Sequence, residues 1–462
     1  MNDQMQASTV AAVSTPPGSG GIAVIRMSGS NARDILAKIW KGKDPRMFES
    51  HTAHVGWIRD TEGNDIDQVV ATVFNSPNSY TGEDVIEISC HGSAWIQRAI
   101  LNSLIESGAE AAGPGEFTRR AFENGKIDLA QAEGVADLIA ASSRASARLA
   151  ASQLKGDFSN KLKILRGQLI DLGSLLELEL DFSEEDVEFA DRSRLIHLAE
   201  EIYSVVSRLA ASYKAGNAFK SGIPVAIVGR PNAGKSTLLN YIAGEEKAIV
   251  SEIAGTTRDV IEDTVELSGI LFRFFDTAGI RKSEDRIENL GIERTLKKIE
   301  EASYVLCLLD STVLASEQKN IKDIAESAPE SASIIFLITK KDLSENSSLD
   351  DYQEIIGDKP AFLISAATGE GIEELEKYLA ESAVSNFNPE RELIVTNTRH
   401  YEALKKAEAP LLRLIEGLKN NVSGDFLAQD LREAEYYLGS VTGEINSSEI
   451  LHTIFSRFCI GK

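Results

Sequence analysis

Eight residues near the middle of the chain have the types and spacing of a phosphate-binding loop. The stretch Gly229-Arg230-Pro231-Asn232-Ala233-Gly234-Lys235-Ser236, followed by Thr237, matches the pattern G-x-x-x-x-G-K-[ST]. Its glycines allow backbone N–H groups to curl around a polyphosphate, Lys235 adds a positive charge, and the Ser236 hydroxyl is a ligand for Mg²⁺. An ordinary glycine-rich turn is the alternative. The apolar run 225–228 before the loop and the helical pattern after it favour the nucleotide site.

A second set of residues predicts that the bound base is guanine. Thr339-Lys340-Lys341-Asp342 follows the apolar run 334–338, and Asp342 could accept two hydrogen bonds that guanine donates and adenine does not. Lys340 would lie along the plane of the base. The stretch Ser365-Ala366-Ala367, which also follows an apolar run, would supply a backbone N–H to guanine O6. A T-K-x-D string alone is common on protein surfaces, so this prediction depends on its position after a strand.

Two further segments would respond to the γ-phosphate. Asp276-Thr277-Ala278-Gly279 ends the apolar run 271–275, where Asp276 would hold Mg²⁺ through water and the Gly279 N–H would face the γ-phosphate. Thr257 lies in the polar segment 255–259 and could complete the Mg²⁺ ligands only when the γ-phosphate is present. Four nucleotide motifs in this order predict a GTPase.

The residue that orients the attacking water is not the usual glutamine, because Ile280 stands where Ras-type enzymes place it. Glu288 is the candidate for this role, and an exposed surface glutamate is the alternative. No arginine finger is evident, although Arg258 is a candidate.

These motifs need a parallel sheet to position them. Residues 221–384 alternate helices with apolar runs, which lie at 225–228, 271–275, 304–309, 334–338 and 361–364. This alternation predicts a doubly wound α/β domain whose chemistry lies at the carboxyl ends of the strands.

The remaining chain predicts two other kinds of domain. Residues 1–125 read as an α+β module, with strands near 53–58, 69–74 and 85–89. Residues 126–220, which contain two long amphipathic helices, and residues 385–462 have helical periodicity. The simplest arrangement is one helical domain interrupted by the GTPase; a separate C-terminal bundle is the alternative.

Two other clusters have ordinary explanations. The pair Cys90 and His91 suggests packing at the end of a strand rather than a metal or nucleophile site, because no third ligand or base is evident. The acidic run 181–186 reads as a solvated loop, with a cation or partner contact as the alternative.

Composition limits the possible functions. The 462 residues suggest about three domains at about 100–200 residues each. The net charge of −23 opposes uniform binding to nucleic acid, so any RNA contact must be local or shared with a more basic partner. Three scattered cysteines, the lack of an apolar run of ~18 residues and an N-terminus unlike a secretory signal predict a soluble cytoplasmic protein without a membrane segment.

The whole chain, residues 1–462, resembles the tRNA modification GTPase family called MnmE or TrmE. The likeness is carried by Gly113-Pro114-Gly115-Glu116-Phe117-Thr118, by Asn124-Gly125-Lys126, by a GTPase inserted in a helical domain, and by the ending Phe458-Cys459-Ile460-Gly461-Lys462. The resemblance implies four parts: a tetrahydrofolate-binding and dimerisation domain (1–125), the first helical part (126–220), the G domain (221–384) and the second helical part (385–462).

The resemblance also implies cofactors and their residues. The N-terminal domain would bind 5-formyl- or 5,10-methylene-tetrahydrofolate as one-carbon donor, at positions that match Arg26, Glu87, Lys126 and Lys462. The G domains of a homodimer would meet across the nucleotides, with K⁺ in place of an arginine finger. The positions that match the K⁺ ligands are Asn232, Ser251, Ile253 and Thr256. Glu288 matches the residue that orients the water.

The implied reaction needs a partner. With a flavin- and NADH-using MnmG protein, in a heterotetramer, family members install an aminomethyl or carboxymethylaminomethyl group at C5 of the wobble uridine (position 34) of certain tRNAs. Cys459 matches a terminal cysteine that could be a nucleophile or could only approach the folate. Thr339 replaces a common asparagine and Ser251 a threonine; threonine at 339 can still bond the loop backbone. A regulatory GTPase acting on a ribosomal or protein partner is the alternative function.

Overall fold

The computed structural model describes residues 8–181, 192–244, 262–276, 299–344, 347–386, 393–445, 448–456 and 458–461. Contacts between Cα atoms divide the chain into two units. Unit 1 comprises Met1–Ala136, Gln153–Phe182 and Leu431–Lys462, and unit 2 comprises Asp137–Ser152 and Ser183–Asp430. Most of the boundaries between the units fall inside helices, and they do not coincide with the four predicted domains. The predicted domain limits therefore stay predictions.

Unit 1 contains a seven-stranded sheet with the order β3-β4-β5-β6-β2-β1-β7. Neighbouring strands are antiparallel except β1 and β7. The strands are β1 (Val10–Val13), β2 (Gly20–Ser28), β3 (Trp40–Lys41), β4 (Thr52–Arg59), β5 (Asp65–Phe74), β6 (Val85–Gly92) and β7 (Glu110–Ala111). Helices α1 (Ala32–Ile39) and α2 (Ala94–Glu106) pack on one face, and apolar residues alternate along β5 because every second side chain points into that core. The three strands predicted near 53–58, 69–74 and 85–89 are confirmed.

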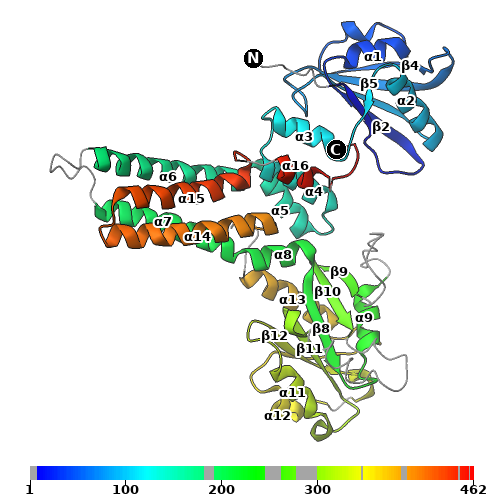
Figure 1. Cartoon of the computed structure of the whole chain (residues 1–462). Coiled ribbons are helices and arrows are strands. Elements are labelled where there is room, and N and C mark those ends of the chain that lie inside the picture. Colours follow the sequence, from blue (N-terminus) through cyan, green and yellow to red (C-terminus); the bar gives the residue numbers. More distant parts are fainter. Residues whose placement is uncertain are drawn as a thin grey trace, which may run out of the picture. The chain divides into compact units, whose positions relative to one another are not determined.

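Unit 1 also contains helices beyond α1 and α2. Four of them are α3 (Glu116–Glu123), α4 (Leu129–Ala140), which runs into unit 2, α6 (Asp157–Asp181) and α16 (Ser448–Phe455). Phe455 and Phe458 share a buried cluster with Leu129 and Ala132 of α4. In Figure 1 the red C-terminal helix α16 accordingly lies beside the cyan helices α3 and α4. The last residues of the chain are therefore part of the N-terminal unit.

Helices from before and after the GTPase segment lie side by side. In unit 2, α7 (Arg192–Ala211) packs along α14 (Thr398–Lys419), as Figure 1 shows. In unit 1, Gly173 of α6 faces Leu431 of α15 (Gly424–Thr442). This pairing supports the interrupted helical domain over a separate C-terminal bundle. Two predicted helices before the GTPase were too few, because α4, α5 (Arg144–Lys155) and α8 (Tyr213–Ser221) are also present.

Unit 2 contains a six-stranded sheet with the order β13-β12-β11-β8-β10-β9, parallel except for the edge strand β9. The strands are β8 (Ile223–Gly229), β9 (Glu262–Leu267), β10 (Ile270–Asp276), β11 (Tyr304–Asp310), β12 (Ser333–Thr339) and β13 (Ala361–Leu363). The helices that follow strands are α9 (Lys235–Ala243), α11 (Asn320–Glu326), α12 (Gln353–Ile356) and α13 (Ile372–Asn386). Short 3₁₀ helices cover Pro45–Met47, Ala315–Gln318, Lys341–Leu343 and Leu349–Tyr352.

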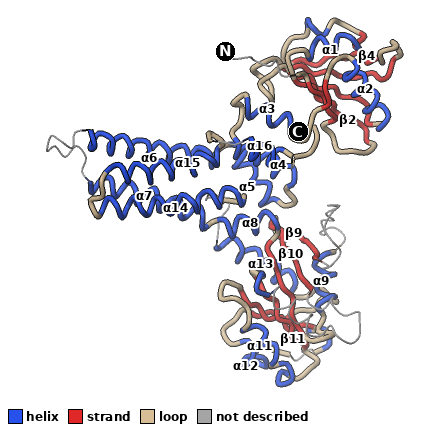
Figure 2. The backbone as a smooth tube through the Cα atoms, in the orientation of Figure 1, coloured by secondary structure: helices blue, strands red, loops and turns tan. Residues whose placement is uncertain are grey.

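Both faces of this sheet are covered. Val225 and Ile227 of β8 belong to one buried cluster, whereas the alternate residues Ala226 and Val228 belong to another. Figure 2 shows the strands in red with helices around them. The doubly wound prediction is confirmed. The sequence prediction missed β9, because its acidic residues hide an alternation in which only Val265 and Leu267 are buried.

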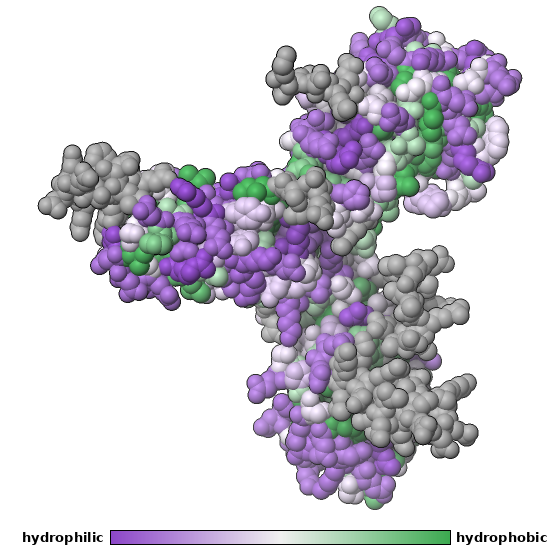
Figure 3. Space-filling view, in the orientation of Figure 1, coloured by the Kyte–Doolittle hydropathy of each residue, from purple (hydrophilic) through white to green (hydrophobic). Residues whose placement is uncertain are grey.

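The visible part of the described surface is mostly hydrophilic (Figure 3). In Figure 3 hydrophilic residues cover most of the visible described surface of each part, and apolar residues form small patches. Among the described residues, none of the helices has the length and apolar character needed to cross a bilayer.

Candidate functional site

The predicted phosphate-binding loop connects β8 to α9. β8 ends at Gly229 and α9 begins at Lys235, with Asn232 (φ +63°) and Gly234 (φ +93°) in the left-handed region between them. A Cβ on Gly229 would lie 2.9 Å from the Leu308 side chain on the neighbouring strand β11, so this position has no room for a larger residue. The loop thus has the strand–turn–helix form that places N–H groups at a helix N-terminus.

Lys235 lies inside this loop. It is only 6% exposed, and its ammonium donates to the carbonyl oxygens of Gly229 and Arg230, both at 2.8 Å. Ser236 and Thr237 are exposed in the first turn of α9, which fits the roles predicted for their hydroxyl groups. The Lys235 ammonium is therefore buried inside the loop, and Ser236 and Thr237 lie exposed beside it.

The base-reading segment is hydrogen-bonded to the phosphate loop. Thr339 is buried at the end of β12, and its hydroxyl donates to Ala233 O at 2.8 Å. This is the contact expected when threonine replaces asparagine here. Lys340 has φ +59° and begins the turn that presents Asp342, whose side chain is exposed. The hydrogen bond from Thr339 directly links the end of β12 to the phosphate loop.

Ser365 supports Asp342 rather than the base. Its hydroxyl donates to Asp342 Oδ1 at 2.5 Å, and its own N–H donates to Glu370 O at 2.9 Å. The sequence prediction grouped Ser365 with Ala366 and Ala367 as the source of the N–H for guanine O6. Because the Ser365 N–H already has an acceptor, Ala366 and Ala367 are the residues of this stretch for which the role stays a prediction.

Asp310 is a residue that sequence reasoning missed. It ends β11, and its carboxylate accepts a hydrogen bond from Lys340 Nζ at 2.6 Å and from the Thr312 hydroxyl at 2.7 Å. Burial raises the pKa of Asp310, but the hydrogen bonds from Lys340 and Thr312 outweigh it and hold the pKa below its usual value. The fully buried Gln318 bonds to both the backbone N–H and the carbonyl of Asp310. Asp310 could have been identified from the sequence as an acidic residue at the end of an otherwise uncharged, largely apolar run.

Several predicted site residues lie outside the described residues. These are Ser251, Ile253, Thr256, Thr257, Arg258, Thr277, Ala278, Gly279, Glu288 and Lys462. The backbone of Asp276 is described: it ends β10 and pairs in register with Ile227 of β8, two residues before the phosphate loop. The acidic run 182–186 also lies outside the described residues.

A second set of site residues gathers in the N-terminal sheet. Arg26 of β2 and Glu87 of β6 are opposite in register and form an ion pair at 2.8 Å. The Arg26 guanidinium also lies over two aromatic rings, 5.3 Å from the Tyr80 centroid and 5.5 Å from that of Phe117. The ammonium of Lys126 donates to Pro77 O at 3.0 Å, in the loop that leads to Tyr80.

The end of the chain lies in the same unit. Gly115 N–H donates to Cys459 O at 3.3 Å, Ile460 forms an antiparallel bridge with Pro114, and the Ser14 hydroxyl donates to Gly461 O at 3.0 Å. Phe117, which touches Arg26, is two residues after Gly115. Residues 459–461, which directly precede the undescribed Lys462, thus lie against the N-terminal segments around Ser14 and Gly115.

The three cysteines differ in their surroundings. Cys459 is exposed, whereas Cys90 and Cys307 are buried. Burial raises the pKa of Cys90 to about 11 and that of Cys307 to about 12, so both stay protonated thiols near neutral pH. Cys90 packs in the core as expected. His91 is exposed instead, and its Nδ1 lies 2.7 Å from Asp67 Oδ1.

Comparisons with known proteins cover nearly the whole chain. A family model for the MnmE helical domain matches residues 129–459, and one for the N-terminus of the GTP-binding protein TrmE matches residues 9–126. The tRNA modification GTPase MnmE of Cytophaga hutchinsonii is 48% identical over 454 residues, which are 98% of either chain. That of Parabacteroides distasonis is 48% identical over 466 residues, 98% of this chain and 100% of the relative.

Two solved structures are similar to part of the chain. The G domain of the T. maritima FeoB iron transporter covers 35% of this chain and 98% of its own, at 26% identity and a TM-score of 0.27. Aquifex aeolicus Era bound to GDP and AlF₄⁻ covers 41% of this chain and 66% of its own, at 27% identity and a TM-score of 0.28.

Proposed function

The chain belongs to the MnmE (TrmE) family of tRNA modification GTPases, and we propose from this premise the reaction that it serves. It hydrolyses GTP while a partner flavoprotein of the MnmG type, which uses FAD and NADH, shares the chemistry on tRNA. The product carries an aminomethyl or carboxymethylaminomethyl group at C5 of the wobble uridine, position 34.

One observation carries the nucleotide part of this proposal: the hydrogen bond from Thr339 to Ala233 O in the phosphate loop. It fixes the distance between the group that reads the base and the groups that hold the phosphates. Asp342, oriented by Ser365, accepts from guanine N–H groups, and the Lys340 stem lies along the base while Asp310 holds its ammonium. Adenine does not offer the N–H groups that Asp342 would accept from guanine, so the site is expected to discriminate against adenine.

The residues around the loop fit a bound Mg²⁺. The Ser236 hydroxyl is exposed at the N-terminus of α9, and the register of β10 with β8 brings Asp276 to the same edge of the sheet. When bound, the ion neutralises charge on the β- and γ-phosphates. Thr257 is the proposed ligand that depends on the γ-phosphate, and the Gly279 N–H is the proposed donor to that phosphate.

A K⁺ ion and a second copy of the chain complete the proposed catalytic site. Asn232 presents its side chain from an exposed left-handed position of the loop, which suits an oxygen ligand directed away from its own domain. Ser251, Ile253 and Thr256 are the other proposed ligands. K⁺ supplies the positive charge that an arginine finger provides elsewhere, Arg258 is the alternative source of that charge, and Glu288 orients the attacking water.

The N-terminal site fits a reduced folate. Arg26 offers a guanidinium, Glu87 a carboxylate, and Tyr80 and Phe117 offer aromatic faces to a flat heterocycle. Lys126 and Lys462 would pair with the acidic tail of 5-formyl- or 5,10-methylene-tetrahydrofolate, which supplies the one-carbon unit. Cys459 is exposed beside this neighbourhood as a nucleophile or a folate contact.

The proposed assembly is a homodimer joined by its N-terminal domains, bound to the MnmG-type protein as a heterotetramer in the cytoplasm. A net charge of −23 repels RNA at long range, so the flavoprotein is proposed to supply much of the basic surface for tRNA.

Nucleoside analysis tests the proposal. Transfer RNA from cells that lack this protein should lose the C5-modified wobble uridine. Wild-type protein should restore the modification and the Asp342→Asn variant should not. Intact modification in the deletion strain would contradict the proposal and favour a regulatory GTPase.

A further inference from the structure

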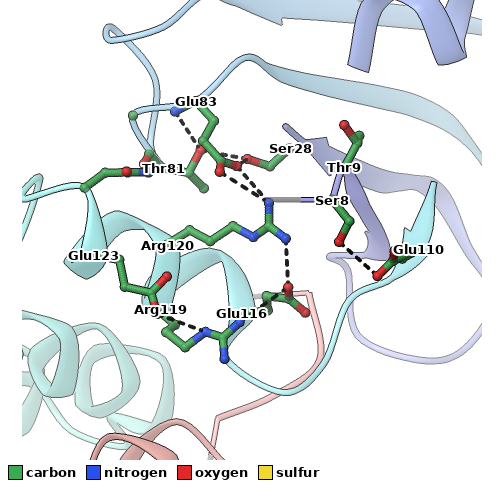
Figure 4. Close-up of polar contacts among 12 residues, drawn as sticks. Ser8, Thr9, Ser28, Thr81, Glu83, Glu110, Glu116, Arg119, Arg120 and Glu123 are labelled. Carbon is green, nitrogen blue, oxygen red and sulfur yellow. Dashed lines mark hydrogen bonds and ion pairs between the residues drawn. The ribbon is translucent and has the colours of Figure 1, made fainter. Parts of the chain in front are cut away.

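A buried arginine joins two loops of the N-terminal unit (Figure 4). Arg120 of α3 is 5% exposed, and its guanidinium points one way to Glu83 and the other way to Glu116. Nη1 donates to the two Glu83 carboxylate oxygens at 3.3 and 3.1 Å, and Nη2 donates to Glu116 Oε1 at 2.9 Å. The planar fork of arginine suits this bridge, whereas a lysine offers a single point charge.

The Glu83 end of the bridge fixes the loop beside Arg26. Glu83 Oε2 also accepts from the Ser28 hydroxyl of β2 at 2.7 Å, and that hydroxyl lies 2.7 Å from the Thr81 hydroxyl. Tyr80, the residue before Thr81, places its ring under the Arg26 guanidinium. The position of one wall of the Arg26–Glu87 site is therefore tied to Arg120.

The Glu116 end fixes the segment that holds the end of the chain. The second carboxylate oxygen of Glu116 accepts from Gly113 N–H at 2.7 Å, which closes the turn 113–116. Gly115 in that turn has φ +65°, and a Cβ there would lie 2.7 Å from Phe455 O. The same residue donates to Cys459 O. Residues 458–461, the C-terminal tail, thus dock on a turn whose shape depends on Glu116.

We propose that Arg120 is a positioning residue that sets the C-terminal tail against the Arg26–Glu87 site. A buried ion pair contributes little net stability compared with apolar packing. We therefore assign the Arg120 contacts a role in positioning rather than in stability. Through Glu83, Arg120 ties the loop before β6 to α3, and through Glu116, four residues earlier on the same helix, it orients the carboxylate that closes the turn 113–116. The consequence for ligand binding rests on the folate site proposed above, whereas the docking of the tail does not.

Trimming of the full-length chain by carboxypeptidase Y, followed by mass spectrometry, tests the docking. Arg120→Lys keeps a charge but not the fork, and residues 459–461 should be removed about tenfold faster than from the wild type, the factor expected when one charged hydrogen bond is lost. Arg119→Lys is the matched control on the same helix. Arg119 is exposed, and its ion pairs with Glu123 and Glu116 are long, at 3.6 and 3.7 Å. Its replacement should therefore leave the trimming rate at the wild-type value.

Glu116→Gln is the second variant, because it weakens the same link and leaves the Glu83–Arg120 pair in place. Faster trimming in this variant, at a temperature well below its unfolding midpoint, supports the proposal. A role in stability alone would lower that midpoint and leave native-state trimming unchanged. If folded Arg120→Lys and Glu116→Gln proteins are both trimmed at the wild-type rate, the proposal that Arg120 positions the C-terminal tail is wrong.

Titration with 5-formyl-tetrahydrofolate, followed by tryptophan fluorescence, separates the two proposals. Both variants should bind it about tenfold more weakly than the wild type, because one of the two loops loses its fixed position. If the wild type binds no folate, the proposed function fails while the trimming result still decides the role of Arg120.

Discussion

Removal of the Thr339 hydroxyl is the sharpest test of the nucleotide site. Thr339→Val keeps the shape of the side chain and deletes the donor that lies 2.8 Å from Ala233 O and 3.2 Å from Leu309 O. One hydroxyl proton serves one of these acceptors at a time, so a single buried hydrogen bond is lost. Thr339 is 3% exposed, and no bulk water replaces the donor at its side chain.

The expected loss is about 1–2 kcal/mol, because the abandoned carbonyl keeps a desolvation cost. The bond joins the base reader to the phosphate loop, so much of this loss should appear in nucleotide binding. We expect the Kd for GDP, measured with a fluorescent analogue, to rise about 5- to 30-fold. Preference for guanine over adenine should persist, because Asp342 is untouched.

Two controls decide the interpretation. Thr312→Val makes the same change at an exposed residue whose hydroxyl bonds to Asp310 and not to the phosphate loop, so it should raise the Kd less. Thr339→Asn restores a donor and should bind nucleotide within about threefold of the wild type. An unchanged Kd in Thr339→Val, with normal urea unfolding, would refute the coupling of base reader and phosphate loop.

Four further outcomes are expected. Asp342→Asn should lower GTP affinity roughly 10²–10⁴-fold and raise affinity for xanthosine triphosphate; unchanged GTP affinity would refute the base-reading role. GTP turnover should fall steeply when Na⁺ replaces K⁺, and equal rates in both salts would exclude the K⁺ site. The pKa of Asp310 is lowered in the folded chain, so its pair with Lys340 stabilises the G domain above the unfolded pKa of about 4 and is lost as the pH falls through the lower folded value. Urea unfolding from pH 3 to 6 should show less acid destabilisation in Asp310→Asn than in the wild type, and parallel curves would speak against the pair. Maleimide at pH 7 should label one thiol quickly, and labelling that persists in Cys459→Ser would show that a buried cysteine is accessible.

The local backbone structure of the site was predictable where it depends on residues that are neighbours in the sequence. The phosphate loop needs only a strand, a turn and a helix within a short stretch, and β8, Gly234 and α9 supply them in that order. The end of β12 is an equally local signal, because this buried strand is a nearly continuous apolar run. The order of the strands in the sheet follows from the family of doubly wound folds rather than from any one residue.

The parts that escaped prediction depend on distant partners. Nothing near Arg120 in the sequence shows that it bridges Glu83, 37 residues earlier. Ser365 reads like a base contact until its hydroxyl is found on Asp342 and its N–H on Glu370. Helices α4 and α5 were missed for another reason: they are short and rich in alanine, so their apolar stripe is weak beside the leucine stripes of α6 and α7.

The hydrogen bond from Ser14 to Gly461 spans 447 positions of the sequence, and this sets an order of events during protein synthesis. The first strands of the N-terminal sheet leave the ribosome long before the residues that dock on them. At ~5–20 residues per second the delay is roughly 20–90 s. Once the turn around Gly115 has been made, it stays without the tail until residues 459–461 are added. A chain without residues 459–461 would lack the contacts that these residues make with Gly115 and Ser14.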